Sequence, residues 1–134
     1  MFIDPTPAQF EALVAAAGNP APVFMLNLLR FAEQARPVDG IDGPLSGLEM
    51  YERYAAETAP HLARVGGEIL WAGACTPAVI GPIDGEWDIV AVVRYPSRAA
   101  FLEMIGDADY LAISRLRTAS LADSRLIPCD SFAG

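Results

Sequence analysis

Two segments of the chain are hydrophobic at almost every position. They read VFMLNLLR over residues 23–30 and IVAVVRY over residues 89–95. A strand with one face in water alternates polar and apolar residues, so these segments predict strands that are buried on both faces. Together with two further apolar segments, they predict strands over about 22–30, 68–80, 87–95 and 124–129.

Between these strands lie segments whose apolar residues recur at helical spacing. Thr6 and Gln9 form a predicted capping box ahead of a short amphipathic helix over about 6–17, and Ser46 and Glu49 form another ahead of a helix that ends at Val65. The buried face of this second helix is predicted to carry Tyr51, Tyr54, Ala55, Thr58, Leu62 and Val65. A last helical region starts after Pro96-Ser97 and is broken at Gly106-Asp107.

The connection over residues 31–47 is long and rich in glycine and proline. Loops of this length inside a compact domain are often functional or mobile. The alternatives are a lid, an arm that reaches a partner subunit, and a plain flexible insertion.

The element order predicts an α+β fold of the ferredoxin-like βαββαβ type in a single domain, 1–134, with its core over about 22–129. The right-handed crossover rule gives an antiparallel sheet of order 4-1-3-2 with the helices on one face. The two doubly apolar strands then form the central pair, and the strand over 68–80, which contains Pro77, lies at an edge. Because the helices cover one face only, we expect a second copy to cover the other, giving a two-fold homodimer in which bare sheet faces pack together.

Charge and composition limit the partners. The net charge is −8 and the isoelectric point about 4.4, which argues against nucleic acid and against anionic lipid surfaces. No apolar run approaches the ~20 residues of a membrane span, and Asp4-Pro5 stands where a signal peptide would need basic and apolar residues, so we expect a cytoplasmic protein. Cys75 and Cys129 are expected as reduced thiols on opposite sheet edges.

Several stretches of the sequence resemble one known family. The most distinctive are RYPSR over 94–98 and DSRLI over 123–127, and MLNLLRF over 25–31 is similar to the opening strand of that family. Over about residues 22–128 the chain resembles domain-of-unknown-function family 1330. The resemblance implies the dimeric α/β-barrel superfamily, whose members include cofactor-independent monooxygenases, haem-degrading enzymes, isomerases, dehydratases and binding modules. The fold alone selects none of these activities.

Three residues are candidate catalytic groups. Asn27 is a lone amide in an apolar strand, where it either orients a ligand or bonds a neighbouring protein group. Arg94 is suited to binding a carboxylate or enolate, or else to a salt bridge between subunits or near a strand end. His61 is the single histidine, the side-chain type that exchanges protons near neutral pH, and the alternative is a partly exposed helix residue.

Four further residues are candidate substrate-binding groups, namely Tyr54, Trp71, Asp88 and Tyr110. No metal motif and no cofactor-binding motif stands out in the sequence. We therefore expect a small-molecule enzyme without an organic cofactor, oxygenase- or isomerase-like, with a pocket between sheet and helices. The alternatives are a binding module without chemistry and a dimeric assembly protein. An enzyme requires Asn27, Arg94 and His61 to converge around a cavity.

Overall fold

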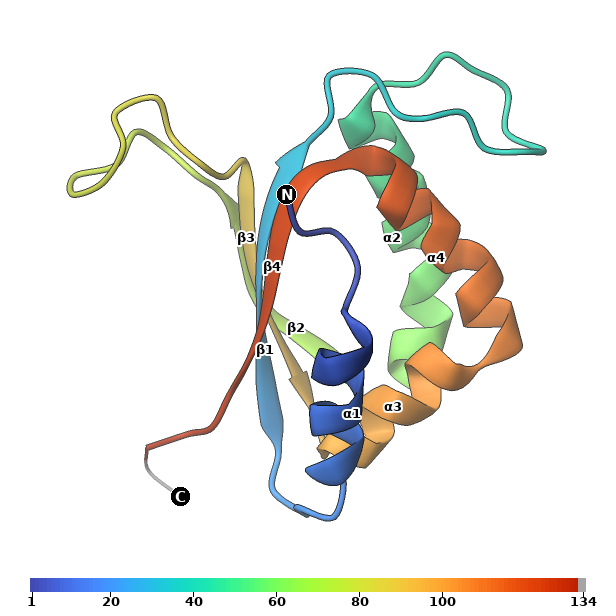
Figure 1. Cartoon of the computed structure of the whole chain (residues 1–134), viewed down its shortest axis with the longest axis vertical. Coiled ribbons are helices and arrows are strands. Elements are labelled where there is room, and N and C mark those ends of the chain that lie inside the picture. The colour runs from blue at the N-terminus through green and yellow to red at the C-terminus, as the bar shows by residue number, and fades with distance from the viewer. Residues whose placement is uncertain (133–134) are drawn as a thin grey trace.

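The computed structural model describes residues 1–132. The elements are, in chain order, α1 (Pro7–Ala15), β1 (Val23–Phe31), α2 (Gly47–Arg64), β2 (Glu68–Ala74), β3 (Ile89–Tyr95), α3 (Arg98–Gly106), α4 (Ala108–Ser120) and β4 (Leu121–Cys129). The strands form one antiparallel sheet of order β2-β3-β1-β4, which confirms the expected order. All helices lie on one side of this sheet (Figure 1).

The helices begin where side chains satisfy their first backbone N–H groups. Thr6 and Gln9 at α1, and Ser46 and Glu49 at α2, exchange the two hydrogen bonds of a capping box. The Asp107 carboxylate accepts the N–H groups of two residues in the first turn of α4, which is why the last helical region is divided into α3 and α4.

Register and alternation assign each residue of the central strands to one face of the sheet. Val23, Met25 and Leu29 of β1 are buried under the helices. The opposite side, which we call the open face, is apolar at its centre. Its apolar members are Phe24, Leu26 and Leu28 of β1, Val90 and Val92 of β3, Trp71 of β2 and Ile127 of β4.

The β2–β3 connection is longer than the sequence predicts. β2 ends at Ala74 and not near residue 80, and β3 begins at Ile89 and not at Trp87. The ladder stops because the segment between them contains Pro77 and Pro82, which have no N–H to donate. The expected turn does form, since the Gly85 N–H bonds the Pro82 carbonyl, but it lies within a loop over 75–88.

The segment over 32–46 packs against its own chain. Its two ends are joined by a bridge between Gln34 and Ser46 and by the hydrogen bond from the Ala35 N–H to the Leu45 carbonyl. The Arg36 N–H bonds a carbonyl near the end of α4. Ala35 is buried, and Val38, Ile41 and Leu45 pack on the core. These contacts hold both ends of the segment and several of its apolar side chains against its own chain.

Within residues 1–132, no helix is both long enough and apolar enough to cross a bilayer.

The start of α2 depends on a close backbone approach at Gly47. A Cβ atom there would overlap the Ala32 carbonyl oxygen and lie 2.6 Å from the Ser120 carbonyl oxygen. Both oxygens belong to the hydrogen-bonded joint between the end of β1 and the end of α4, because Ala32 N–H bonds Ser120 O.

We therefore predict that Gly47→Ala lowers the free energy of unfolding by about 1–3 kcal/mol, the usual cost of overpacking. Gly106→Ala is the matched control, because no atom lies within 4 Å of a Cβ added there. Urea unfolding followed by circular dichroism measures both variants. Equal midpoints for the two variants would contradict the close approach at Gly47.

Candidate functional site

The sheet separates two of the three expected catalytic residues. Asn27 has the same parity as Met25 and Leu29, so its side chain faces the helices. Arg94 pairs in register with Phe24, which places Arg94 on the open face. Within one chain, the expected convergence of Asn27, Arg94 and His61 therefore does not occur.

Arg94 and Asp88 also lie apart. They occupy opposite ends of the β3 region, and six residues of strand span about 20 Å. The Asp88 carboxylate accepts the Phe31 N–H at 2.9 Å and so joins the end of β1 to the loop before β3. Within residues 1–132, the Arg94 side chain has no hydrogen bond or ion pair.

Trp71 does not line the layer between sheet and helices. It pairs with Val92 on the open face, its ring lies over Gly73, and 59% of its surface is exposed. The predicted role of Trp71 in substrate binding stays a prediction, and its position relates it to the open face and not to the layer under the helices. A register shift between Ile69 and Trp71, typical of a β-bulge, sets the side to which Trp71 points.

The structure does bring together three of the expected residues on α2 and α4. The hydroxyl groups of Tyr54 and Tyr110 lie 2.7 Å apart and form a buried hydrogen bond. The His61 ring stands edge-on to the Tyr110 ring, with 6.4 Å between centroids. These contacts form where α2 packs against α4, at residues far apart in the sequence.

A fourth polar residue, Thr58, lies on the same stripe of α2. Tyr54, Thr58 and His61 are spaced by four and three residues, so they follow one helix face. Thr58 is buried, and its Oγ1 has no hydrogen-bond partner within the described residues. The sequence pattern placed Thr58 on the buried face but did not single it out as a candidate functional residue, although a buried threonine in an otherwise apolar stripe is itself a signal.

The hydroxyl groups of Tyr54, Tyr110 and Thr58 can donate more hydrogen bonds than they make within the described residues. One hydroxyl of the Tyr54–Tyr110 pair donates to the other, so one O–H remains free to donate to a third group. Thr58 has a second uncommitted hydroxyl. Buried polar groups normally find partners, in the protein or in a bound molecule.

The phenols of this layer are held in their neutral form. Burial raises the pKa of Tyr51 to about 12, and the nearby Tyr54 adds to the shift. Burial likewise raises the pKa values of Tyr95 and Tyr110, again with Tyr54 contributing. These groups therefore act as hydrogen-bond donors at neutral pH and not as bases.

His61 connects the phenols to charged groups at the surface. Its Nδ1 lies 3.3 Å from Arg64 Nη2 and 3.9 Å from Asp107 Oδ1. The Tyr110 N–H bond lowers the pKa of Asp107, and the Asp109 N–H, Arg64 and His61 lower it further. With its proton on Nε2, His61 accepts from Arg64 at Nδ1, whereas the tautomer with its proton on Nδ1 presents Nδ1–H to the Asp107 carboxylate and leaves Nε2 as an acceptor.

Asn27 is only partly satisfied. Its Nδ2 donates to the Met25 carbonyl at 3.2 Å, while its Oδ1 has no partner within residues 1–132. The Asn27 amide thus offers an acceptor to the layer between the sheet and the helices.

A cavity lies at a different place, beneath the 32–46 segment. It has a volume of about 220 Å³. Its lining includes Ala35, Arg36, Val38, Ile41, Leu45 and Met50. Asn27 and the Tyr54–Tyr110 pair do not line this cavity, so it is separate from the polar group on α2 and α4.

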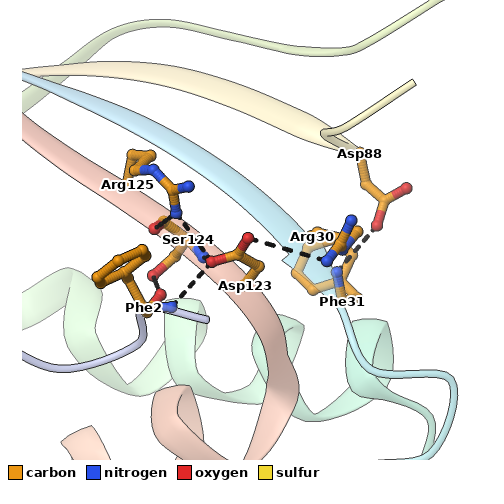
Figure 2. Close-up of polar contacts among 7 residues, drawn as sticks. All are labelled: Phe2, Arg30, Phe31, Asp88, Asp123, Ser124 and Arg125. Atoms are coloured by element: carbon orange, nitrogen blue, oxygen red, sulfur yellow. Dashed lines mark hydrogen bonds and ion pairs between the residues drawn. The ribbon is translucent and has the colours of Figure 1, made fainter. Parts of the chain in front are cut away.

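A second polar cluster fastens the N-terminus to β4 (Figure 2). Asp123 accepts the Phe2 N–H at 2.9 Å and pairs with Arg125 at 2.8 Å, while Arg30 lies 3.8 Å from its second oxygen. The Arg125 guanidinium stacks between the rings of Phe2 and Trp87. The Phe2 N–H bond and the Arg125 bond lower the pKa of Asp123 to about 2.

The described residues do not form a metal-binding cluster. Among residues 1–132, no group of three or more histidine, cysteine, aspartate or glutamate side chains is placed to hold a metal ion. Cys75 and Cys129 are free thiols at the β2 and β4 edges, as the topology predicts.

Solved structures place this architecture in the ferredoxin-like class. A dabb family protein with a ferredoxin-like fold from Mesorhizobium loti has a TM-score of 0.53 at 10% identity, over 83% of this chain and 97% of that one. A hydroxynitrile lyase from Passiflora edulis has a TM-score of 0.54 at 14% identity, over 83% of this chain and 94% of that one. At these identities the likeness concerns the fold alone.

The chain belongs to the family of domains of unknown function DUF1330, whose pattern matches residues 45–128. RPA0582, a protein of unknown function from Rhodopseudomonas palustris, is 38% identical over 97% of this chain and 96% of its own, with a TM-score of 0.89. The methylated form of RPA0582 gives a TM-score of 0.90 at the same 38% identity, over 98% of this chain and 95% of its own. Among functionally curated proteins, none matches the sequence.

The raised pKa of Tyr110 predicts how Tyr110→Phe changes stability with pH. At neutral pH we expect a loss of about 1 kcal/mol, because Tyr54 loses its hydrogen-bond partner. Above pH 10.0 the wild type must keep Tyr110 protonated in order to stay folded, so its stability falls more steeply with pH than that of the variant, in which only Tyr51 and Tyr95 keep raised pKa values. Urea unfolding across this range measures the two curves, and parallel curves would contradict the buried neutral phenol.

The lowered pKa of Asp123 predicts an acid-dependent contribution to stability. A depressed carboxyl pKa stabilises the fold above the ordinary value of 3.8, and the stabilisation is lost as the pH falls toward about 2. We expect Asp123→Asn to lower the melting temperature at neutral pH and the difference to vanish at about pH 2. Asp84→Asn, in the exposed β2–β3 loop, is the control. A difference that persists unchanged in acid would refute the ionic role of Asp123.

Proposed function

We propose that this protein acts on a small oxygen-bearing molecule, by proton transfer and without an organic cofactor, in the layer between the sheet and the pair α2–α4. The observation that carries the proposal is the uncommitted hydrogen-bonding capacity of Tyr54, Thr58 and Tyr110 beside His61. Such groups favour a ligand with a carbonyl or enolate oxygen, which accepts the free O–H of the tyrosine pair.

The chemistry suited to these residues is isomerase-like. A neutral phenol stabilises an oxyanion by donating to it, because the negative charge develops on the ligand oxygen. His61, with its own proton on Nδ1 toward Asp107, takes the proton from the carbon beside the carbonyl at Nε2 and returns it to the same or a neighbouring carbon. The Asp107 carboxylate holds the imidazole in place and stabilises the positive charge that it gains. Asn27, which faces the same layer, is a candidate acceptor for a ligand hydroxyl.

We further propose that the protein is a homodimer in which two open faces pack together. The apolar centre of the open face supports this assembly, because a monomer leaves these side chains without cover. Under this proposal Arg94 and Trp71 belong to the subunit interface and not to the catalytic group. An assembly protein without chemistry is the second candidate, and it needs the interface alone.

Deuterium exchange at carbon tests the catalytic proposal directly. We expect the wild type to accelerate exchange of the carbon-bound protons of pyruvate or acetylacetone in deuterium oxide, followed by proton NMR. His61→Gln is expected to reduce the protein-dependent rate by about 10²–10⁴-fold, the usual contribution of a general base. Tyr110→Phe is expected to reduce it less, because Tyr54 retains a hydroxyl.

Arg53→Gln, on the exposed side of α2, is the matched control and leaves the rate unchanged. The single histidine also gives one unambiguous imidazole signal, so each compound reports its binding on His61 itself. Equal rates for wild type and His61→Gln, together with an imidazole signal that no compound shifts, would leave the assembly protein as the better reading.

A further inference from the structure

The β2–β3 loop over 75–88, which we call the arm, exposes aliphatic side chains almost completely. Val79 is 99% exposed, Ile80 96% and Ile83 87%. None of the three belongs to the core cluster or packs against it. A soluble chain does not usually hold three large aliphatic side chains together in water unless a partner covers them.

The arm extends toward the side of the sheet that the helices leave uncovered. In Figure 1 it leaves the upper ends of β2 and β3 and projects away from the helices, beyond the open face. The chain after β4 leaves the lower end of the sheet toward the same side (Figure 1), and its Phe132 is fully exposed. The open face thus lies between two projecting segments of its own chain.

Charge favours a second copy of this chain as the occupant. The chain carries a net charge of −8, which opposes self-association, so two copies meet at the lowest electrostatic cost on surface that is itself uncharged. Residues 75–83 read CTPAVIGPI and contain no charged side chain, and the carboxylates of the arm, Asp84, Glu86 and Asp88, follow this stretch. The centre of the open face, between Glu68 and Arg94 at one end and Arg125 at the other, is uncharged as well.

The size of the open face indicates that the sheet alone makes a small interface. Four strands of 7 to 9 residues, at about 3.3 Å per residue and about 4.8 Å between strands, cover about 500 Å². A stable interface commonly buries about 800 Å² of accessible surface on each partner, a quantity that also counts the relief of the side chains. The arm adds apolar surface next to the sheet and on the same side.

We propose that the arm is a dimerisation arm, which packs Val79, Ile80 and Ile83 on a second copy of the chain and closes the rim of the space between two open faces. This inference rests on the proposed homodimer and adds a specific element to it. By two-fold symmetry each subunit gives one arm and receives one, so six aliphatic side chains leave water in each dimer.

Sedimentation equilibrium of the full chain tests the arm separately from the sheet. The arm variant combines Val79→Ser, Ile80→Ser and Ile83→Ser, and its fold is expected to be intact because these side chains are exposed. The sheet variant is Val92→Arg, at the centre of the open face. The matched control is Leu111→Ser, an exposed aliphatic residue on α4, on the other side of the molecule.

We expect the arm variant to raise the dimer dissociation constant by about tenfold or more, the sheet variant to give monomers, and the control to match the wild type. An arm variant with the wild-type dissociation constant would overturn the arm and leave the sheet-to-sheet dimer standing. A wild type that stays monomeric at every concentration would overturn both. If the sheet variant stays dimeric while the arm variant does not, the result supports the arm and overturns the packing of open faces.

Discussion

The central strands β1 and β3 are apolar on both faces, and the rest of the molecule is organised around the need to cover them. Four helices cover one face and bury Met25, Leu29 and their neighbours. Hydrophobic burial is the dominant favourable term in folding, so a sheet with a second apolar face is stable in water only with a second cover. In the proposed dimer, the open face and the arm that projects past it meet the same constraint together.

The layer beneath the helices holds the polar residues on which the proposed chemistry depends. All four tyrosines of the chain lie there, and those at 51, 95 and 110 have raised pKa values because burial disfavours the phenolate. The Tyr54–Tyr110 hydroxyl pair and Thr58 keep hydrogen-bonding capacity that an apolar core would not need. His61, at the end of the same stripe, joins this interior to Asp107 and Arg64 at the surface.

Strand parity decides which candidate residues can act together. Asn27 and Arg94 were both predicted from their residue types, but they lie on opposite faces of one sheet. Their parity along each strand was readable from the sequence, whereas the register between β1 and β3 that relates the two strands was not. His61 and Tyr110 meet because α2 packs on α4, and no local pattern encodes that contact. Candidate residues on the same strand or helix were therefore easier to group than those on different elements.

The sequence by itself determined the elements, their caps and the sheet order, because capping hydrogen bonds and hydrophobic periodicity act between neighbouring residues. It also indicated a sheet whose two faces are both apolar at the centre, since β1 and β3 are hydrophobic at almost every position of the sequence. Only the tertiary structure decided where the β2–β3 ladder ends, that 32–46 packs on its own chain and that 75–88 projects. These features depend on contacts between distant segments, whose free energies are set by packing and not by local propensity.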